Sequence, residues 1–285
     1  MPAFSSLLRV SRNLASSEKV PACTTKRPVS LLSLGLDAGL ASDFALTTGA
    51  GKYGSVSGNV IPSASGAAFT VDTWVKPTSF NSTGKYDVIM TQGDTDVSRR
   101  FYLGVLDQRV VACLGFVCTG TSVAQLTAGA WTHLAVVVNP ASSSITMYVN
   151  GSTVGQDVTT HASWSNISVN GDLLIGKSAQ AVSDYRNFEG QINQVKIWNG
   201  ALTTAQVGES RAHFGFAGTR ATASLLAHYS FDSATSSLAL DDSGNGNHLG
   251  LTGLSDSDIV AGEKVFRGTP QNVNFFDLNL PNTRT

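Results

Sequence analysis

The chain has 285 residues, of which 42% are hydrophobic and 14% are charged, and its formal net charge is −1. This length and apolar content are enough to bury one large core or two small ones. The near-neutral charge gives no overall field that would attract nucleic acid, and no apolar run reaches the roughly 18 residues that a membrane span needs. We therefore expect neither a nucleic-acid partner nor a membrane span.

Residues 1–33 are predicted to form a basic N-terminal arm. Residues 1–31 contain Arg9, Arg12, Lys19, Lys26 and Arg27 but a single acidic residue, Glu18, and apolar residues at 7, 8, 10 and 14 could line one side of a short helix. This pattern is typical of a mitochondrial presequence. Two alternatives stay open, an arm that lies against a neighbouring chain and a disordered tail.

From residue 34 to residue 210 the sequence has the pattern of short strands separated by turn residues. Apolar and polar residues alternate over residues 69–77, and Pro77, which cannot donate a hydrogen bond to a ladder, ends that strand. Residues 134–138 and 145–149 predict a central β-hairpin, and Asn150-Gly151 predict a turn into a third strand near Val154. Further strands are predicted at 44–46, 53–60, 88–90, 101–105, 110–114, 172–176 and 188–198, and one helix at 201–207.

The three cysteines, Cys23, Cys113 and Cys118, do not make a disulfide framework. Cys113 and Cys118 flank four residues, and two interpretations stay open. They could face each other across a turn as a disulfide, which would suit an oxidising compartment, or they could be two buried thiols in a strand pair. No histidine lies nearby at a ligand spacing, so these cysteines do not predict a metal site.

Four segments carry a family resemblance when they are taken together. FTVDTWVKP, WTHLAVVV with ITMYVNG, LLIGKSA, and FEGQINQVKIWNGALTTAQV occur in this order and resemble the LamG-like jelly-roll domains of the concanavalin A-like lectin/glucanase superfamily. The resemblance covers about residues 40–207. It implies an all-β fold, a two-sheet antiparallel jelly-roll sandwich, which agrees with the alternation.

The segment 211–255 departs from the family pattern. LLAHYSFD at 225–232 and LDDSGNGNH at 240–248 resemble the family's opening strand and loop, but they follow the domain. The residues after Asn247 are too few to bury a second sandwich core, so we expect a permuted strand that completes the first sandwich. The alternative is pairing with an exposed edge of a neighbouring subunit. Residues 256–285 are predicted to be a C-terminal docking tail, because their apolar residues need a partner surface.

The sequence predicts no enzyme and no catalytic residue. Glycoside hydrolysis needs two carboxyl groups about 5 to 9.5 Å apart. The chain contains four glutamates, and none is paired within a predicted strand: they are Glu18, Glu189, Glu209 and Glu263. No local signature of Ser/His or Cys/His catalysis is present either.

A calcium ion is the one cofactor that the resemblance suggests, because many domains of the family bind it with loop oxygens. Asp241, Asp242, Asn245 and Asn247 form an oxygen-rich loop with glycine hinges that could ligate such a hard cation. The alternative is that the Asn and Gly residues simply form turns and the aspartates cap them.

Two aromatic residues are candidates for ligand binding. Trp164 lies in a predicted loop, and Tyr185 is a second candidate platform for a sugar. A buried loop anchor is the alternative for Trp164. Trp74, Trp131 and Trp198 lie in predicted strands, where we expect them to fill the core.

Three functions are compatible with these features. We favour a non-catalytic structural or decorating subunit of a large assembly, such as a virus or phage particle, with other protein subunits bound through the arm and the tail. The second is a secreted or surface lectin-like module that binds glycans, and the third is an accessory subunit of a mitochondrial complex. The corresponding locations are a virion or extracellular surface and, for the third function, the mitochondrion.

Overall fold

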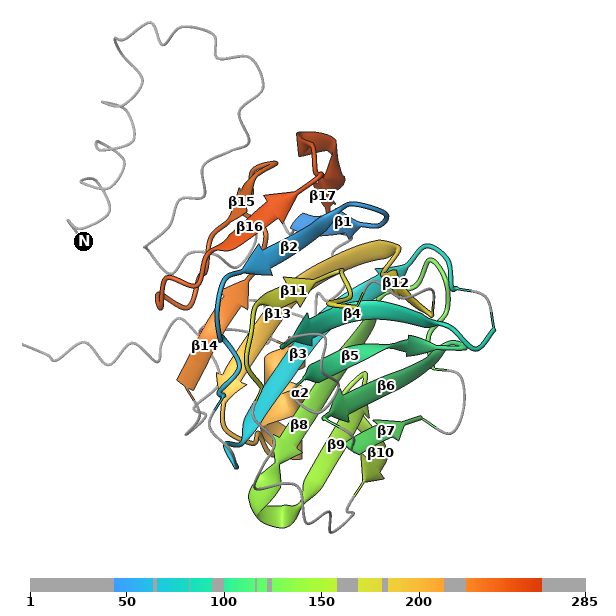
Figure 1. Ribbon diagram of the computed structural model, residues 1–285, viewed down its shortest axis with the longest axis vertical. Coiled ribbons are helices and arrows are strands. Elements are labelled where there is room, and N and C mark those ends of the chain that lie inside the picture. The colour runs from blue at the N-terminus through green and yellow to red at the C-terminus, as the bar shows by residue number, and fades with distance from the viewer. Residues whose placement is uncertain are drawn as a thin grey trace, which may run out of the picture. The chain divides into compact units, whose positions relative to one another are not determined.

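The computed structural model describes residues 44–63, 66–81, 83–93, 100–115, 117–121, 125–157, 169–180, 184–212 and 224–262. The predicted arm, Cys23 and Trp164 lie outside these ranges, as do residues 263–285 of the predicted tail. The described residues form one eight-stranded and one nine-stranded sheet (Figure 1). The predicted all-β sandwich of two antiparallel sheets is therefore confirmed.

The eight-stranded sheet has the order β10-β9-β8-β3-β13-β1-β17, and β14 also pairs with β13. Its strands are β1 (Phe44–Thr48), β3 (Phe69–Pro77), β8 (Thr132–Asn139), β9 (Ser144–Val149), β10 (Ser152–Asp157), β13 (Gly190–Asn199), β14 (Ser224–Tyr229) and β17 (Ile259–Ala261). The predicted central hairpin is β8–β9, with Leu134 opposite Val149. Asn150 and Gly151 have φ values of 52° and 82°, the left-handed conformation that the Asn-Gly pair predicted for the turn.

The nine-stranded sheet has the order β15-β16-β2-β11-β4-β5-β6-β7, and β12 runs parallel to β4. Its strands are β2 (Tyr53–Val56), β4 (Tyr86–Gln92), β5 (Phe101–Leu106), β6 (Arg109–Leu114), β7 (Val117–Gly120), β11 (Leu173–Ile175), β12 (Tyr185–Asn187), β15 (Leu238–Ala239) and β16 (Leu249–Thr252). Cys113 on β6 lies opposite Cys118 on β7, and the two form a disulfide. The alternative of two buried thiols is therefore wrong, since the register places both sulfurs on one face of adjacent strands.

The main core fills the space between the sheets. On β3, Phe69, Val71 and Val75 are at most 1% exposed and belong to this core, as the alternation predicted. Phe69 meets Phe101 of the facing sheet edge to face, with ring centroids 5.2 Å apart and ring planes at 87°. This geometry is favourable for aromatic pairs and joins the two layers at their centre.

The segment after residue 223 completes both sheets within its own chain. β3 occupies one edge of β13, while β1 and β14 share the other edge, β1 next to residues 190–192 and β14 next to residues 195–199. β16 adds to β2 in the other sheet, and β17 adds to β1. These strands, orange to red in Figure 1, therefore pair inside the molecule and not with a neighbouring edge. β17 lies within the predicted docking tail, residues 256–285, but it is a strand of the sandwich. The sandwich therefore extends past the predicted boundary at residue 256.

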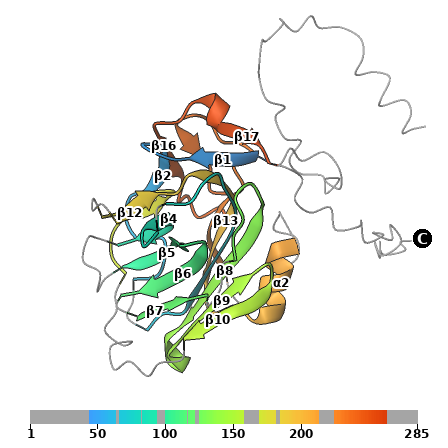
Figure 2. The same cartoon turned by 90° about the vertical axis from the view of Figure 1, so that its right-hand side faces the viewer.

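Helix α2 (Thr204–Ala212) covers the outer face of the eight-stranded sheet (Figure 2). It is the predicted helix, and it ends at Ala212 instead of residue 207. Thr203 and Gln206 form a capping box, in which the Gln206 amide donates to Thr203 Oγ1 at 3.3 Å and the Thr203 amide donates to Gln206 Oε1 at 2.8 Å. Apolar residues of the helix and sheet form a second, smaller core: Ala135, Val137, Tyr148, Trp198, Leu202 and Val207.

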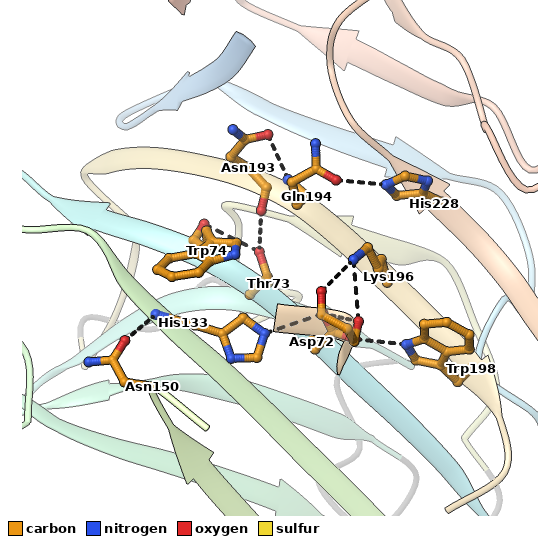
Figure 3. A network of polar contacts seen from close by, with 11 residues as sticks. Asp72, Thr73, Trp74, His133, Asn150, Asn193, Gln194, Lys196, Trp198 and His228 are labelled. Atoms are coloured by element: carbon orange, nitrogen blue, oxygen red, sulfur yellow. Dashed lines mark hydrogen bonds and ion pairs between the residues drawn. The ribbon is translucent and has the colours of Figure 1, made fainter. Parts of the chain in front are cut away.

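A buried polar network lies beneath α2 (Figure 3). Asp72 accepts hydrogen bonds from Trp198 Nε1 at 2.7 Å and from Ser210 Oγ at 3.0 Å, and His133 Nε2 lies 3.4 Å from its other oxygen. Lys196 Nζ donates to the Ser210 carbonyl at 2.9 Å. All five residues are at most 4% exposed. The network therefore ties α2 to β3, β8 and β13, and it has no surface that a ligand could reach.

The opposite charges of Asp72 and Lys196 stabilise each other in this network. Burial raises the pKa of Asp72, but Lys196 and the hydrogen bonds from His133 and Trp198 outweigh it, so the pKa lies below its ordinary value. Burial lowers the pKa of Lys196, against the opposing effect of Asp72. A buried charge is tolerated only when it is paired and hydrogen-bonded, so these residues depend strongly on one another.

We expect the protein to lose stability between about pH 6.5 and pH 4 because His228 is buried. Its Nε2 lies 2.9 Å from Gln194 Oε1, and burial, followed by the charge of Lys196, lowers its pKa from 6.5 to about 4. The unfolded chain therefore binds a proton at a higher pH than the folded chain does. The free energy of unfolding falls by about 3 kcal/mol across this window. Below pH 4, His228 causes no further loss.

Urea unfolding at pH 7 and at pH 4.5 measures this loss. His228→Gln removes the titrating group, so the difference between the two pH values should shrink in the variant. It should not vanish, because burial also lowers the pKa of His133. An unchanged pH difference in the variant would show that His228 does not carry the effect.

Candidate functional site

Three tyrosines gather on the outer face of the nine-stranded sheet. Tyr86 of β4 and Tyr185 of β12 lie opposite each other in register, and their rings stack with centroids 4.8 Å apart and planes at 10°. Tyr102 of β5 meets both rings edge to face, at 5.8 Å and 5.9 Å. We call these three residues the tyrosine cluster. Tyr185, predicted as a ligand-binding residue, is therefore part of an aromatic group that the sequence did not reveal.

The alternation of β5 sends this cluster to the outer face. Phe101, Leu103 and Val105 belong to the core, so Arg100, Tyr102 and Gly104 point the other way. Tyr102 lies over Gly104, where a Cβ atom would collide with the tyrosine hydroxyl and come within 2.6 Å of the Asp87 carbonyl. Glycine is therefore required at position 104 for the Tyr102 ring to lie flat on the sheet.

The disulfide lies on the same face and beside the cluster. Tyr102 is in register with Thr91 on β4 and with Cys113 on β6, and Cys113 is in register with Cys118 on β7. Directly opposed residues in a sheet share one face, so these four side chains form a continuous row. The bond joins the edge strand β7 to the strand next to the cluster.

One polar group of the cluster lacks, among the described residues, the hydrogen-bond partner that buried groups usually have. Tyr102 is 3% exposed, and within the described parts of the chain its hydroxyl has no hydrogen-bond partner. Burial, followed by the neighbouring tyrosines, raises the pKa of Tyr102 well above 10, so the hydroxyl keeps its proton and can donate it. The Arg100 guanidinium lies 5.6 Å from the centre of the Tyr185 ring.

An ion-pair network positions Tyr185 on Tyr86. Arg186, next to Tyr185 on β12, donates from Nε to Asp87 Oδ1 at 2.7 Å and lies 3.5 Å from Glu189 Oε1. Asp87 also accepts a hydrogen bond from the Asn81 amide at 2.8 Å. These contacts fix β12 against β4, and they leave both carboxylates engaged with Arg186.

The predicted calcium loop is closed by its own hydrogen bonds. Asp241 accepts from the backbone amides of His228, Ser243 and Asn247 at 2.9 to 3.0 Å. Burial raises the pKa of Asp241, but the hydrogen bonds outweigh it and hold the pKa below its ordinary value. Asp242 accepts from Ser230 at 2.6 Å.

The two asparagines of the loop turn their amide nitrogens inward. Asn245 Nδ2 donates to the Leu225 carbonyl at 2.8 Å, and Asn247 Nδ2 donates to the Leu226 carbonyl at 2.8 Å. Across the described residues, no group of three or more His, Cys, Asp or Glu side chains is placed to hold a metal ion. The donor set fits a turn that is capped on β14 better than it fits an open cation site, and calcium binding at these four residues stays a prediction.

The predicted aromatic residues have different positions. Trp164 lies outside the described ranges, so its role stays a prediction. Trp74 and Trp198 are 2% and 4% exposed. They lie under α2 and not in the main core, because they occupy the outward positions of β3 and β13. Trp131 precedes β8 and is half-buried.

The fold and this outward-facing cluster define a lectin-like sandwich domain. The family model of the concanavalin A-like lectin/glucanases superfamily matches residues 48–208, more than half of the chain. The chain belongs to this superfamily, as the resemblance in the sequence predicted. No curated protein matches the sequence.

Solved structures share the fold at low sequence identity. A proposed carbohydrate-binding protein of Bacteroides ovatus matches 73% of this chain and 58% of its own length, with a TM-score of 0.52 and 18% identity. A heptameric pentraxin of Limulus polyphemus matches 65% of this chain and 87% of its own, with a TM-score of 0.45 and 17% identity. The carbohydrate-binding module of a Ruminococcus gnavus sialidase, bound to α2,3-sialyllactose, matches 50% and 80%, with a TM-score of 0.43 and 14% identity.

These matches establish the fold alone. The chain spans less than two thirds of the length of the Bacteroides ovatus protein. In the described ranges, no helix is both long and apolar enough to cross a membrane.

Proposed function

We propose that the protein is a non-catalytic carbohydrate-binding module and that its sugar-binding surface is the tyrosine cluster. The observation that carries this proposal is the stacked, half-buried pair of Tyr86 and Tyr185 on the outer face of a lectin-type sandwich. The Bacteroides ovatus protein of similar fold, itself a proposed carbohydrate-binding protein, supports it.

The chemistry of the cluster suits a sugar ring. A sugar presents an apolar face of C–H groups and a rim of hydroxyls, so it needs a flat apolar platform with a few polar groups at its margin. Tyr86 and Tyr185 supply the platform. The guanidinium of Arg100, over the Tyr185 ring, supplies a polar group at the margin.

We expect Tyr185→Ala to weaken sugar binding by about 10-fold, because it removes one of the two stacked rings of the platform and, with it, an aromatic contact worth about 0.5 to 1.5 kcal/mol beyond the buried area. A glycan array with the wild-type protein identifies the ligand, and isothermal titration measures both affinities. Tyr53→Ala is the matched control. Tyr53 lies on β2 of the same sheet, where its ring contacts Lys177 at 3.8 Å. Equal losses in the two variants, or no loss in Tyr185→Ala, would refute the assignment.

The absence of catalysis is part of the proposal. Asp87 and Glu189 are two carboxylates near the cluster, and both are ion-paired with Arg186. An acid catalyst needs a raised pKa and a nucleophile needs a free oxygen, and ion pairing with arginine favours neither. Incubating the bound glycan with the protein and finding no new reducing ends would support this part of the proposal.

An extracellular or surface location is the setting that we propose. The Cys113–Cys118 disulfide supports it, because such bonds persist in oxidising compartments and are rare in the cytosol. The virion or phage subunit and the mitochondrial subunit stay predictions, since the arm and the last residues of the tail lie outside the described residues. Native mass spectrometry of the untagged protein from its source tests both, by its assembly size and by the presence or absence of the first 33 residues.

A further inference from the structure

We propose that the tyrosine cluster binds an acidic carbohydrate and that Arg100 holds the anionic group of this ligand. This inference rests on the proposed sugar-binding function and names the chemical class of its ligand. It is carried by a charged side chain that is almost fully buried on the binding face and that has no ion-pair partner among the residues that the structure describes.

Arg100 is 7% exposed, yet among the described residues it forms no ion pair with a carboxylate. Its guanidinium lies over the Tyr185 ring. Arg186 makes a direct comparison, since its side chain is 28% exposed and it contacts two carboxylates. Within the described part of the chain, the more deeply buried arginine is thus the one without a counter-ion. Burying a cation is costly unless it is paired, so an anion that arrives with the ligand would recover this cost.

The geometry around Arg100 suits a carboxylate or a sulfate. A guanidinium presents a planar fork of N–H groups that matches such anions with two parallel hydrogen bonds. The Tyr185 ring holds this guanidinium from one side. The cluster therefore places a cation beside an aromatic platform, which is a complementary arrangement for an acidic sugar.

The test compares pairs of probes that differ in charge. Oligogalacturonate is paired with its methyl ester, a heparin oligosaccharide with its desulfated form, and sialyllactose with lactose, and each is titrated against the full chain by calorimetry. We expect at least one acidic probe to bind about tenfold or more tightly than its neutral partner. The pair that shows this difference distinguishes a carboxylate from a sulfate.

Substitutions of single arginines show which residue causes the preference for acidic probes. Arg100→Gln should reduce the difference between acidic and neutral probes to about twofold, while Arg100→Lys should keep part of it because the charge remains. Arg109→Gln, on the exposed start of β6, is the matched control and should keep the full preference. Arg100→Gln should also unfold at the temperature of the wild type or higher, because it removes a buried charge without a counter-ion.

Three results would overturn the inference, and they differ in their consequence for the proposed function. Equal affinity for acidic and neutral probes, together with loss of both in Tyr185→Ala, refutes the acidic ligand and leaves the sugar-binding cluster in place. If none of the probes and no glycan of the array binds, the inference and the proposed function both fail. A charge preference that survives in Arg100→Gln but disappears in Arg109→Gln would place the anion at another surface.

Discussion

Asp72→Ala should destabilise the protein by about 3 to 5 kcal/mol, the usual cost of breaking a buried charge pair by removing one partner. The variant leaves the Lys196 ammonium buried without its compensating charge, and it removes the acceptor of the Trp198 and Ser210 hydrogen bonds. Helix α2 also loses the hydrogen bond from Ser210 to β3, and its bond from Lys196 to the Ser210 carbonyl remains. Chemical unfolding monitored by tryptophan fluorescence measures the change.

Two further variants separate charge from packing. Asp72→Asn combined with Lys196→Met removes both charges and should be more stable than Asp72→Asn alone, because no unpaired charge remains. Asp256→Ala, at an exposed position of η4 (Asp256–Asp258), should change stability by no more than about 0.5 kcal/mol. A small effect of Asp72→Ala, close to that of Asp256→Ala, would contradict the compensation described for the network.

A chain that ends at Ala212 should fail to form the sandwich, although it contains the whole of the predicted domain, residues 34–210, and the whole family match. It lacks β14 to β17 and therefore several fully buried core side chains, among them Tyr229, Leu249 and Phe231. Burying side chains of this size contributes about 1.5 to 3 kcal/mol each, so the total is comparable with the whole stability of a domain, about 5 to 15 kcal/mol. We expect an insoluble or molten product without a cooperative unfolding transition.

A chain that ends at Gly262 is the control for this truncation. It keeps every described strand, and so it should be soluble and should unfold cooperatively. Circular dichroism and thermal melts of the two truncated proteins give the comparison. Cooperative folding of the shorter chain would mean that the segment from residue 224 onward is an accessory to the sandwich and not a part of it.

The fold could be predicted from the sequence because its signals are local. The alternation of residues 69–77, the Asn-Gly turn after β9 and the capping threonine before α2 each depend on a few neighbouring residues. The structure confirms all three elements. The family resemblance then fixed how such strands are layered, which alternation alone leaves open.

The tyrosine cluster could not be predicted in the same way, because it depends on the register between distant strands. Tyr86, Tyr102 and Tyr185 come from three separate strands, and only the pairing of β12 and β5 with β4 brings them together. Tyr185 was a candidate by its residue type alone. The alternation of β5 does place Arg100 and Tyr102 on the polar side of the strand, which was a usable signal, but not one that identifies their neighbours.

The disulfide could not be predicted with certainty from the sequence either, although its two cysteines are close in the chain. The spacing of Cys113 and Cys118 allowed a facing pair, but it gave no reason to prefer one over two separate thiols. That reason is the direct opposition of the two residues across β6 and β7. For the calcium loop, the sequence grouped four oxygen-bearing side chains, but it could not show which of their atoms already bond to the backbone of β14.

The shared edge of β13 also has a consequence for how the protein is made. Phe44 in the first described strand pairs with Ala261 in the last. In the same way, β2 pairs with β16, which comes about 200 residues later in the chain. During synthesis on the ribosome, β1, β2 and β13 emerge with open edges that remain unpaired until nearly all of the described chain has been translated. Pairing over such long separations is slow, and open edges attract other chains. The nascent protein should therefore depend on chaperones or slow translation until residues 224–261 emerge.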